Sequence, residues 1–222
     1  MTFLPSSAGL PEIALCRLSV VTAPSAEPVT TDEVKLWLRV DDTADDALIA
    51  GLITAARSIF EQLTGRALVE TTYLATWDGL PRVGTYGGAG LSRELELPRA
   101  PFAATSPVAW LKYLDEDGVE QTVASSDYTV ETGRDAARYP RLVLNEAASW
   151  PTLGSYPGAL RCQFTAGYGA ASDVPAEIKV CLKQLVTHLY QNRAPVNVGN
   201  IVNELPWALS TLIELHRIRS LV

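Results

Sequence analysis

The first clear pattern of hydrophobic and polar positions is helical and begins near residue 30. Thr30, with Glu33 three residues later, is the signature of a capping box. The apolar positions Val34, Trp37 and Leu38 then follow at the spacing of one helical face. We therefore expect a short first helix that begins after Thr30.

A second helical pattern follows a short acidic stretch. Thr43 and Asp46 repeat the spacing of a start signal, and apolar residues continue along one face from Leu48 to Leu63. Gly65 then supplies a residue that commonly ends a helix. This second helix is predicted to be the longer of the two.

After Gly65 the apolar period falls to two, the period of a strand with one buried face. The alternation begins at Val69 and ends at Trp77. Further strand-like runs occupy residues 95–97, 108–114, 119–123, 128–130, 142–144 and 160–166. Asp117-Gly118 lies between two of these runs and favours a tight hairpin turn. The middle third of the chain is therefore predicted to form antiparallel β structure.

Helical spacing returns after Pro175 and persists until Pro195, and Pro206 opens one more helical segment. The chain ends in a basic and apolar tail, residues 217–222. Before the first helix, residues 1–29 contain four prolines, a composition typical of an extended arm with at most one short strand at residues 13–21.

These patterns predict an α+β protein in which the N- and C-terminal helix pairs form a small four-helix bundle with an inserted antiparallel β domain. The expected divisions are an extended arm at 1–29, the first two helices at 30–66, the β domain at 67–170, and the last two helices with the tail at 171–222.

Composition and charge limit the class of protein. Hydrophobic residues make up 47% of the 222 residues, which argues against intrinsic disorder, and a net charge of -7 argues against a basic surface that grips nucleic acid. Residues 30–64 carry a charge of -4 and residues 174–222 a charge of +2, so opposite ends of neighbouring subunits could attract. The longest apolar run, from Ala47, meets Arg57 too soon to span a membrane.

Candidate catalytic chemistry is sparse in this sequence. Its two histidines accompany no G-x-S-x-G motif, and its three cysteines lack the paired spacing of a zinc site or a disulfide framework. Four aspartates cluster at residues 41–46, where they suit a helix N-terminus better than a calcium loop. We therefore expect no enzyme, no metal and no cofactor.

Interaction residues are easier to nominate. Trp37 and Trp207 occur on short helices, and large aromatic side chains are typical anchors of protein interfaces. With the acidic residues Asp41 and Asp42 they form the predicted subunit interface.

Several segments, in order, resemble phage head-tail connector proteins of the gp6-like adaptor family, including the adaptors of gene transfer agents. In the first part of the chain they are PVTTDEVKLWLRVD at 28–41, DDALI at 45–49 and TGRAL at 64–68. Further along they are LPRAP at 97–101, WP at 150–151, FTAGYG at 164–169, VPAEIK at 174–179 and LYQNR at 189–193. The order of these segments along the chain makes the resemblance specific.

The resemblance implies a virion protein that is assembled in the host cytoplasm into a ring, with twelve subunits expected, below the portal protein. Such a ring extends the channel through which genomic DNA passes without sequence-specific binding, and it receives a stopper or tail-terminator protein. No membrane is involved. By the same resemblance, the C-terminal segment enters the portal, and the matching residues are Arg217, Ile218, Arg219, Leu221 and Val222.

Two other functions stay open at this point. A stopper or tail-terminator protein also forms rings, but such proteins are usually dominated by β structure. A small enzyme with an unrecognised site would need titratable groups that converge in a pocket.

Overall fold

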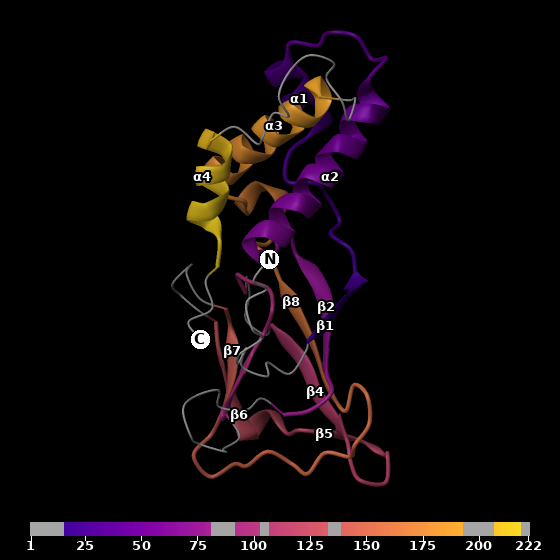
Figure 1. The fold of residues 1–222 in the computed structure, drawn as a ribbon, viewed down its shortest axis with the longest axis vertical. Helices are drawn as coiled ribbons and strands as arrows, with labels where there is room; N and C mark the ends of the chain where they lie inside the picture. The colour runs from indigo at the N-terminus through magenta and orange to yellow at the C-terminus, as the bar shows by residue number, and fades with distance from the viewer. Residues whose placement is uncertain (1–15, 81–91, 103–106, 133–138, 193–206, 219–222) are drawn as a thin grey trace, which may run out of the picture.

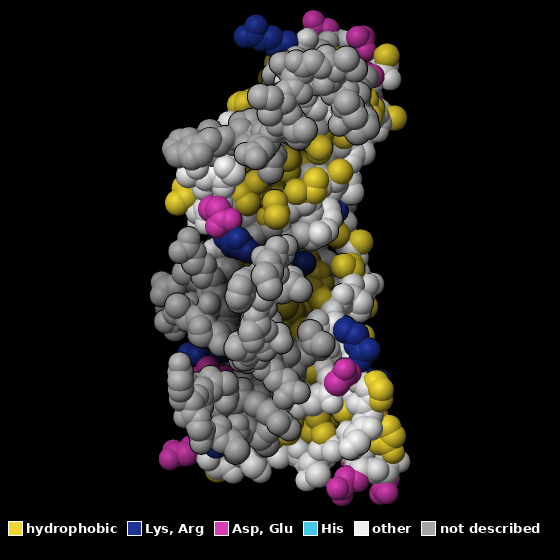
Figure 2. Space-filling model, in the orientation of Figure 1, with side chains coloured by type: hydrophobic (Ala, Val, Ile, Leu, Met, Phe, Trp, Pro, Cys, Tyr) yellow, Lys and Arg dark blue, Asp and Glu magenta, His cyan; other side chains and the backbone are white. Residues whose placement is uncertain are grey.

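The computed structural model describes residues 16–80, 92–102, 107–132, 139–192 and 207–218. Its outline is elongated (Figures 1 and 2). The helices gather at one end and the strands at the other (Figure 1). The long helix α2 runs through the helical end and leads directly into the strands.

Four helices are present among the described residues: α1 (Thr31–Leu38), α2 (Asp46–Thr64), α3 (Ala176–Gln191) and α4 (Trp207–His216). The expected capping box precedes α1, because the Thr30 hydroxyl accepts from the Glu33 N–H at 3.1 Å and the Glu33 carboxylate accepts from the Thr30 N–H at 2.9 Å. The second start signal is wrong: Asp45, not Thr43, is the N-cap of α2.

The strands form two antiparallel sheets. A five-stranded sheet has the order β1 (Arg17–Thr22), β2 (Thr71–Trp77), β8 (Leu160–Ala166), β4 (Val108–Leu114) and β5 (Glu120–Thr122). A three-stranded sheet has the order β3 (Glu94–Glu96), β7 (Arg141–Leu144) and β6 (Tyr128–Glu131). Short 3-10 helices lie at Ser125–Asp127 and Ala171–Asp173. Strand β2 shows the expected alternation, with every second side chain buried from Thr71 to Trp77.

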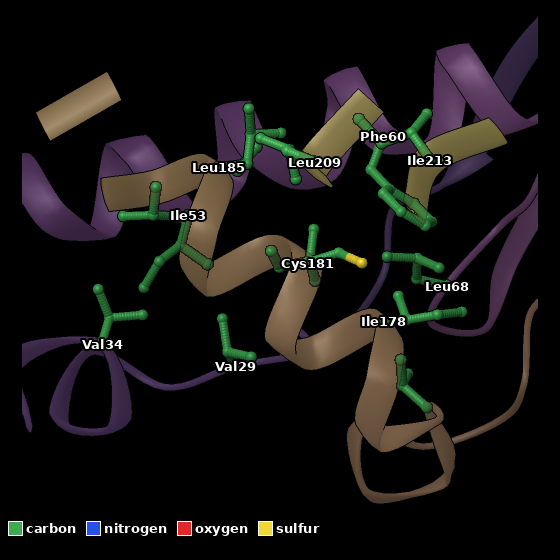
Figure 3. Close-up of a cluster of buried hydrophobic side chains, with 14 of the residues drawn as sticks. Val29, Val34, Ile53, Phe60, Leu68, Ile178, Cys181, Leu185, Leu209 and Ile213 are labelled. Atoms are coloured by element: carbon green, nitrogen blue, oxygen red, sulfur yellow. The ribbon is translucent and has the colours of Figure 1, made fainter. Parts of the chain in front are cut away.

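Each half of the molecule has its own hydrophobic core. In the helical half, side chains from all four helices meet, together with Val29 before α1 and Leu68 after α2 (Figure 3). In the strand half, the buried residues come from both sheets, and the rings of Tyr73 and Phe164 stack with centroids 5.7 Å apart. Helix α2 and the residues that follow it therefore join two separately packed regions.

The predicted fold class, a small four-helix bundle with an inserted β domain, is wrong. Among the described residues the helix and strand contents are roughly equal, and the eight strands form two sheets. The five-stranded sheet also takes its edge strand β1 from before the first helix, so it is not built from one insertion. The short strand expected at residues 13–21 overlaps β1, but its place in this sheet was not predicted, because nearly every residue of β1 is exposed and its partner β2 follows both of the first two helices.

Candidate functional site

One candidate contact surface lies where α1 leads into α2. Leu36 is 83% exposed and Trp37 45% exposed on α1, and the side chains of Asp41, Asp42 and Leu48 are also exposed. We call these five residues the acidic end. On α1, Leu36 and Trp37 point outward because the helix directs Val34 into the helical core.

Lys35 on α1 lies close to the acidic end and interacts with nearby carboxylates, among them that of Asp42. The ammonium of Lys35 forms an ion pair with Asp46 at 2.7 Å, and this hydrogen bond raises the pKa of Lys35. Lys35 is thus directed toward α2. The carboxylate of Asp42 accepts a hydrogen bond from the Ala44 N–H at 3.0 Å, which holds the loop in place. An apolar surface with an acidic border results.

A second candidate region lies at the other end of α2, where the C-terminal segment returns. The buried Arg66, 3% exposed, donates from Nε to the His216 carbonyl at 2.6 Å and from Nη1 to the Tyr168 hydroxyl at 3.1 Å. The Ile218 N–H donates to the Thr64 carbonyl at 2.8 Å. We call Thr64, Arg66, His216 and Ile218 the C-terminal anchor.

The imidazole of His216 lies partly buried within the C-terminal anchor. Its ring centroid is 6.1 Å from that of Phe60, in a tilted arrangement. Burial lowers the pKa of His216, and the nearby positive charge of Arg66 lowers it further, against a small opposing effect of Glu177. The imidazole is consequently neutral at neutral pH, which suits its place beside a buried cation.

A partly buried ionic network supports the same end of α2. Arg57 pairs with Glu27 at 2.7 Å and with Glu61 at 3.0 Å, and Glu61 accepts the Leu68 N–H at 2.8 Å. Burial raises the pKa of Glu61 despite these partners. The network ties the segment before α1 to α2 and to the start of the strand half.

The structure places the predicted site residues in two separate regions. Trp37, Asp41 and Asp42 lie together at the acidic end. Arg217 is exposed and pairs with Glu214 at 3.0 Å. The two regions lie at opposite ends of α2, and a helix of 19 residues spans roughly 27 Å.

Other predicted site residues are placed differently. Ile218, expected to bind a partner, is only 5% exposed and belongs to the protein's own interior. Trp207 opens α4, but its side chain lies outside the described residues, as do Arg219, Leu221 and Val222. A surface made of all these residues is therefore not assembled within one subunit.

Arg66 is the residue that sequence analysis missed. It lies in the TGRAL segment, where the glycine attracted attention as a helix stop. Its partners are 102 and 150 residues away in the sequence, so no local periodicity could indicate them. The sequence feature that could have indicated a buried role for Arg66 is its position between a helix stop and the first residues of a buried strand.

The candidate surfaces formed by the described residues consist of charged and apolar side chains suited to protein contacts. They contain no group of three or more His, Cys, Asp or Glu that could hold a metal ion. The three thiols are free, and burial raises the pKa of Cys16 to about 11 and that of Cys162 still further. No described helix is long and apolar enough to cross a membrane.

Part of the chain matches a known protein family. The family model of the phage gp6-like head-tail connector protein matches residues 29–93. That segment holds α1, α2, the acidic end and Arg66. The resemblance noted in the sequence is thus confirmed for this part of the chain. No curated protein sequence matches the chain significantly.

Solved structures extend the likeness to nearly the whole chain. A chain from the neck of an empty gene transfer agent particle, computed with C6 symmetry, aligns with a TM-score of 0.72 and 24% identity, over 93% of this chain and 97% of its own. A chain from the neck of the native particle, computed with C12 symmetry, gives 0.68 and 23% over 93% and 97%. A chain from the native virion gives 0.69 and 24% over 92% and 97%. At this identity the likeness establishes a shared fold.

Proposed function

We propose that this protein is a structural head-tail connector, an adaptor of a tailed phage or gene transfer agent, and that it resides in the virion. The observation that carries the proposal is the connector-family match over residues 29–93, the segment that builds the acidic end and supplies Arg66. The fold shared with chains of a gene transfer agent neck and virion supports the same role.

The proposed assembly is a ring of identical subunits, with twelve as the expected number. Symmetric necks of six- and twelvefold symmetry among the similar structures support a ring. A ring needs two different complementary patches on each subunit. The acidic end, with Trp37, Asp41 and Asp42, is proposed as one patch, because its apolar side chains are exposed in the single subunit. Trp207 is proposed to belong to the same subunit interface.

The proposed partners lie above and below the ring. The C-terminal segment, first nominated as Arg217, Ile218, Arg219, Leu221 and Val222, is proposed to dock on the portal protein through its residues other than the buried Ile218. A stopper or tail-terminator protein is proposed to bind the opposite side. Genomic DNA passes through the channel, where a net charge of -7 disfavours tight binding to phosphates. The division into arm, first helices, β region and last helices with tail remains part of this proposal.

Light scattering of the purified protein, alone and mixed with the portal encoded by the same genome, tests this function. We expect the portal to gain mass equal to one subunit per portal chain. A variant that lacks residues 219–222 should not bind, yet should unfold at the same denaturant concentration as the full chain. Absence of binding by the full chain at every salt concentration would contradict the adaptor function and favour a stopper or terminator.

A further inference from the structure

The last carbonyl of α4 is bound by a buried cation from another part of the chain. Helix C-termini leave backbone carbonyls without helical partners, and the helix dipole favours positive charge there. Arg66 meets both needs, because its Nε donates to the His216 carbonyl at 2.6 Å. Arg66 therefore acts as a cap for α4 that is supplied by the junction between α2 and β2.

The same junction makes a second backbone contact two residues later. The Ile218 N–H donates to the carbonyl of Thr64, the last residue of α2, and the Ile218 side chain is buried. Arg217, between the two contacts, faces solvent, and its side chain is 54% exposed. The segment is thus held at two points while one of its arginines stays accessible.

The junction that holds this segment is itself firmly placed. The Thr64 hydroxyl donates to the Phe60 carbonyl at 2.7 Å and accepts the Arg66 N–H at 3.3 Å. Gly65 adopts a left-handed conformation with φ of 74°, and the Ala67 N–H donates to the Ala100 carbonyl at 2.8 Å. A rigid junction gives the chain leaving Ile218 a fixed starting point.

We propose that the C-terminal anchor fixes the point where the tail leaves the body, so that Arg66 and Ile218 position the tail while Arg217 and residues 219–222 contact the portal. This rests on the proposed function. It differs from the nomination of the whole segment from Arg217 to Val222, because Ile218 stays in the subunit core in both the free and the docked protein. A tail that starts from a fixed point loses less conformational freedom on docking.

Trypsin cleavage followed by mass spectrometry tests the anchor without any partner. In the native protein the Arg217–Ile218 bond should be cut at least about tenfold more slowly than the Arg219–Ser220 bond, because cleavage requires the anchored segment to open. In Arg66→Met that protection should fall about tenfold. Arg161→Met is the matched control, since Arg161 also donates to a carbonyl, that of Gly158, but in the strand half. Equal cleavage of the two bonds in the native protein would overturn the proposal.

Hydrogen exchange at the Ile218 amide is a second test of the C-terminal anchor, and it can be measured on the native protein. The amide should be protected in the free protein and stay protected when the portal is bound, whereas loss of protection on binding would overturn the proposal. Arg66→Met should also weaken portal binding about tenfold although every docking residue is present. If the native chain does not bind the portal, the proposed function fails, while protection of the free Ile218 amide still decides whether the anchor exists.

Discussion

Gly65 is the single residue whose backbone most constrains the junction between the helical and strand halves. Its φ of 74° is left-handed, and a Cβ added there would collide with the Tyr139 hydroxyl. We expect Gly65→Ala to lower the free energy of unfolding by about 1–2 kcal/mol, mainly from the left-handed conformation, because the Tyr139 side chain can shift its hydroxyl aside. Gly51→Ala should instead stabilise by about 0.5–1 kcal/mol, because Gly51 lies within α2 with open space around its Cα. Urea denaturation measures both, and equal effects would contradict this account.

His216 gives the C-terminal anchor a pH dependence. Burial and Arg66 lower the pKa of the folded imidazole. The unfolded chain therefore takes up a proton at a higher pH than the folded protein does, and stability is lost as the pH falls below about 6.5. Glu61 acts in the opposite direction, because burial raises the pKa of its carboxyl.

The contribution of His216 is isolated by comparing the native protein with His216→Gln at pH 7.5 and pH 5.5. The native protein should lose more stability on acidification than the variant. Chemical denaturation at each pH supplies the free energies, and parallel losses in the two proteins would show that His216 does not carry the effect.

At the scale of elements, the start of α1 depends on reciprocal bonds between Thr30 and Glu33. Thr30→Ala removes the hydroxyl that accepts the Glu33 N–H, and should cost about 1 kcal/mol in the free energy of unfolding. Thr43→Ala is the matched control, because Thr43 precedes α2 but Asp45 is the N-cap, so the control should change stability by less than about 0.5 kcal/mol. A larger loss of stability from Thr43→Ala would support the sequence-based prediction that Thr43 caps α2.

Elements with a strong period of their own could be predicted from the sequence. The apolar stripe between Pro175 and Pro195 became α3, and the run at residues 160–166 became β8. The short strand expected at residues 13–21 overlaps β1, but its pairing with β2 could not be predicted, because β1 is an exposed edge that buries almost nothing. Asp45 illustrates another limit: its carboxylate accepts from the Tyr190 hydroxyl of α3, a long-range contact that local spacing does not contain.

In the candidate site, too, features carried by residues close in sequence could be predicted, and long-range contacts could not. The acidic end could be nominated because Trp37, Asp41 and Asp42 are close in sequence and share one end of the helical half. The C-terminal anchor could not, because Arg66 meets His216 only after the chain has crossed both sheets. The tail residue Ile218 was nominated for portal binding by the family resemblance, whereas tertiary packing buries it.

At the scale of the whole molecule, the helical half and the strand half each expose apolar side chains. Either half could therefore supply the apolar contact between subunits. Leu36 and Trp37 stand at the acidic end, while Val119, 53% exposed, lies next to strand β5 in the other half. If rings form through the helical half, the exposed aromatic ring should carry much of the contact energy. Trp37→Glu should then weaken subunit association about thirtyfold, equivalent to roughly 2 kcal/mol, with little change in the stability of the monomer.

Val119→Glu is the control for that experiment, since it adds the same charge to an equally exposed apolar position. Sedimentation velocity over a range of concentrations, with portal present to template the ring, gives the association constants of both variants. A loss caused by Val119→Glu and not by Trp37→Glu would place the subunit contact in the strand half. Because Asp41 and Asp42 border the patch, association through it should also weaken as salt rises if the facing surface is basic, and Asp41→Asn with Asp42→Asn should remove that salt dependence.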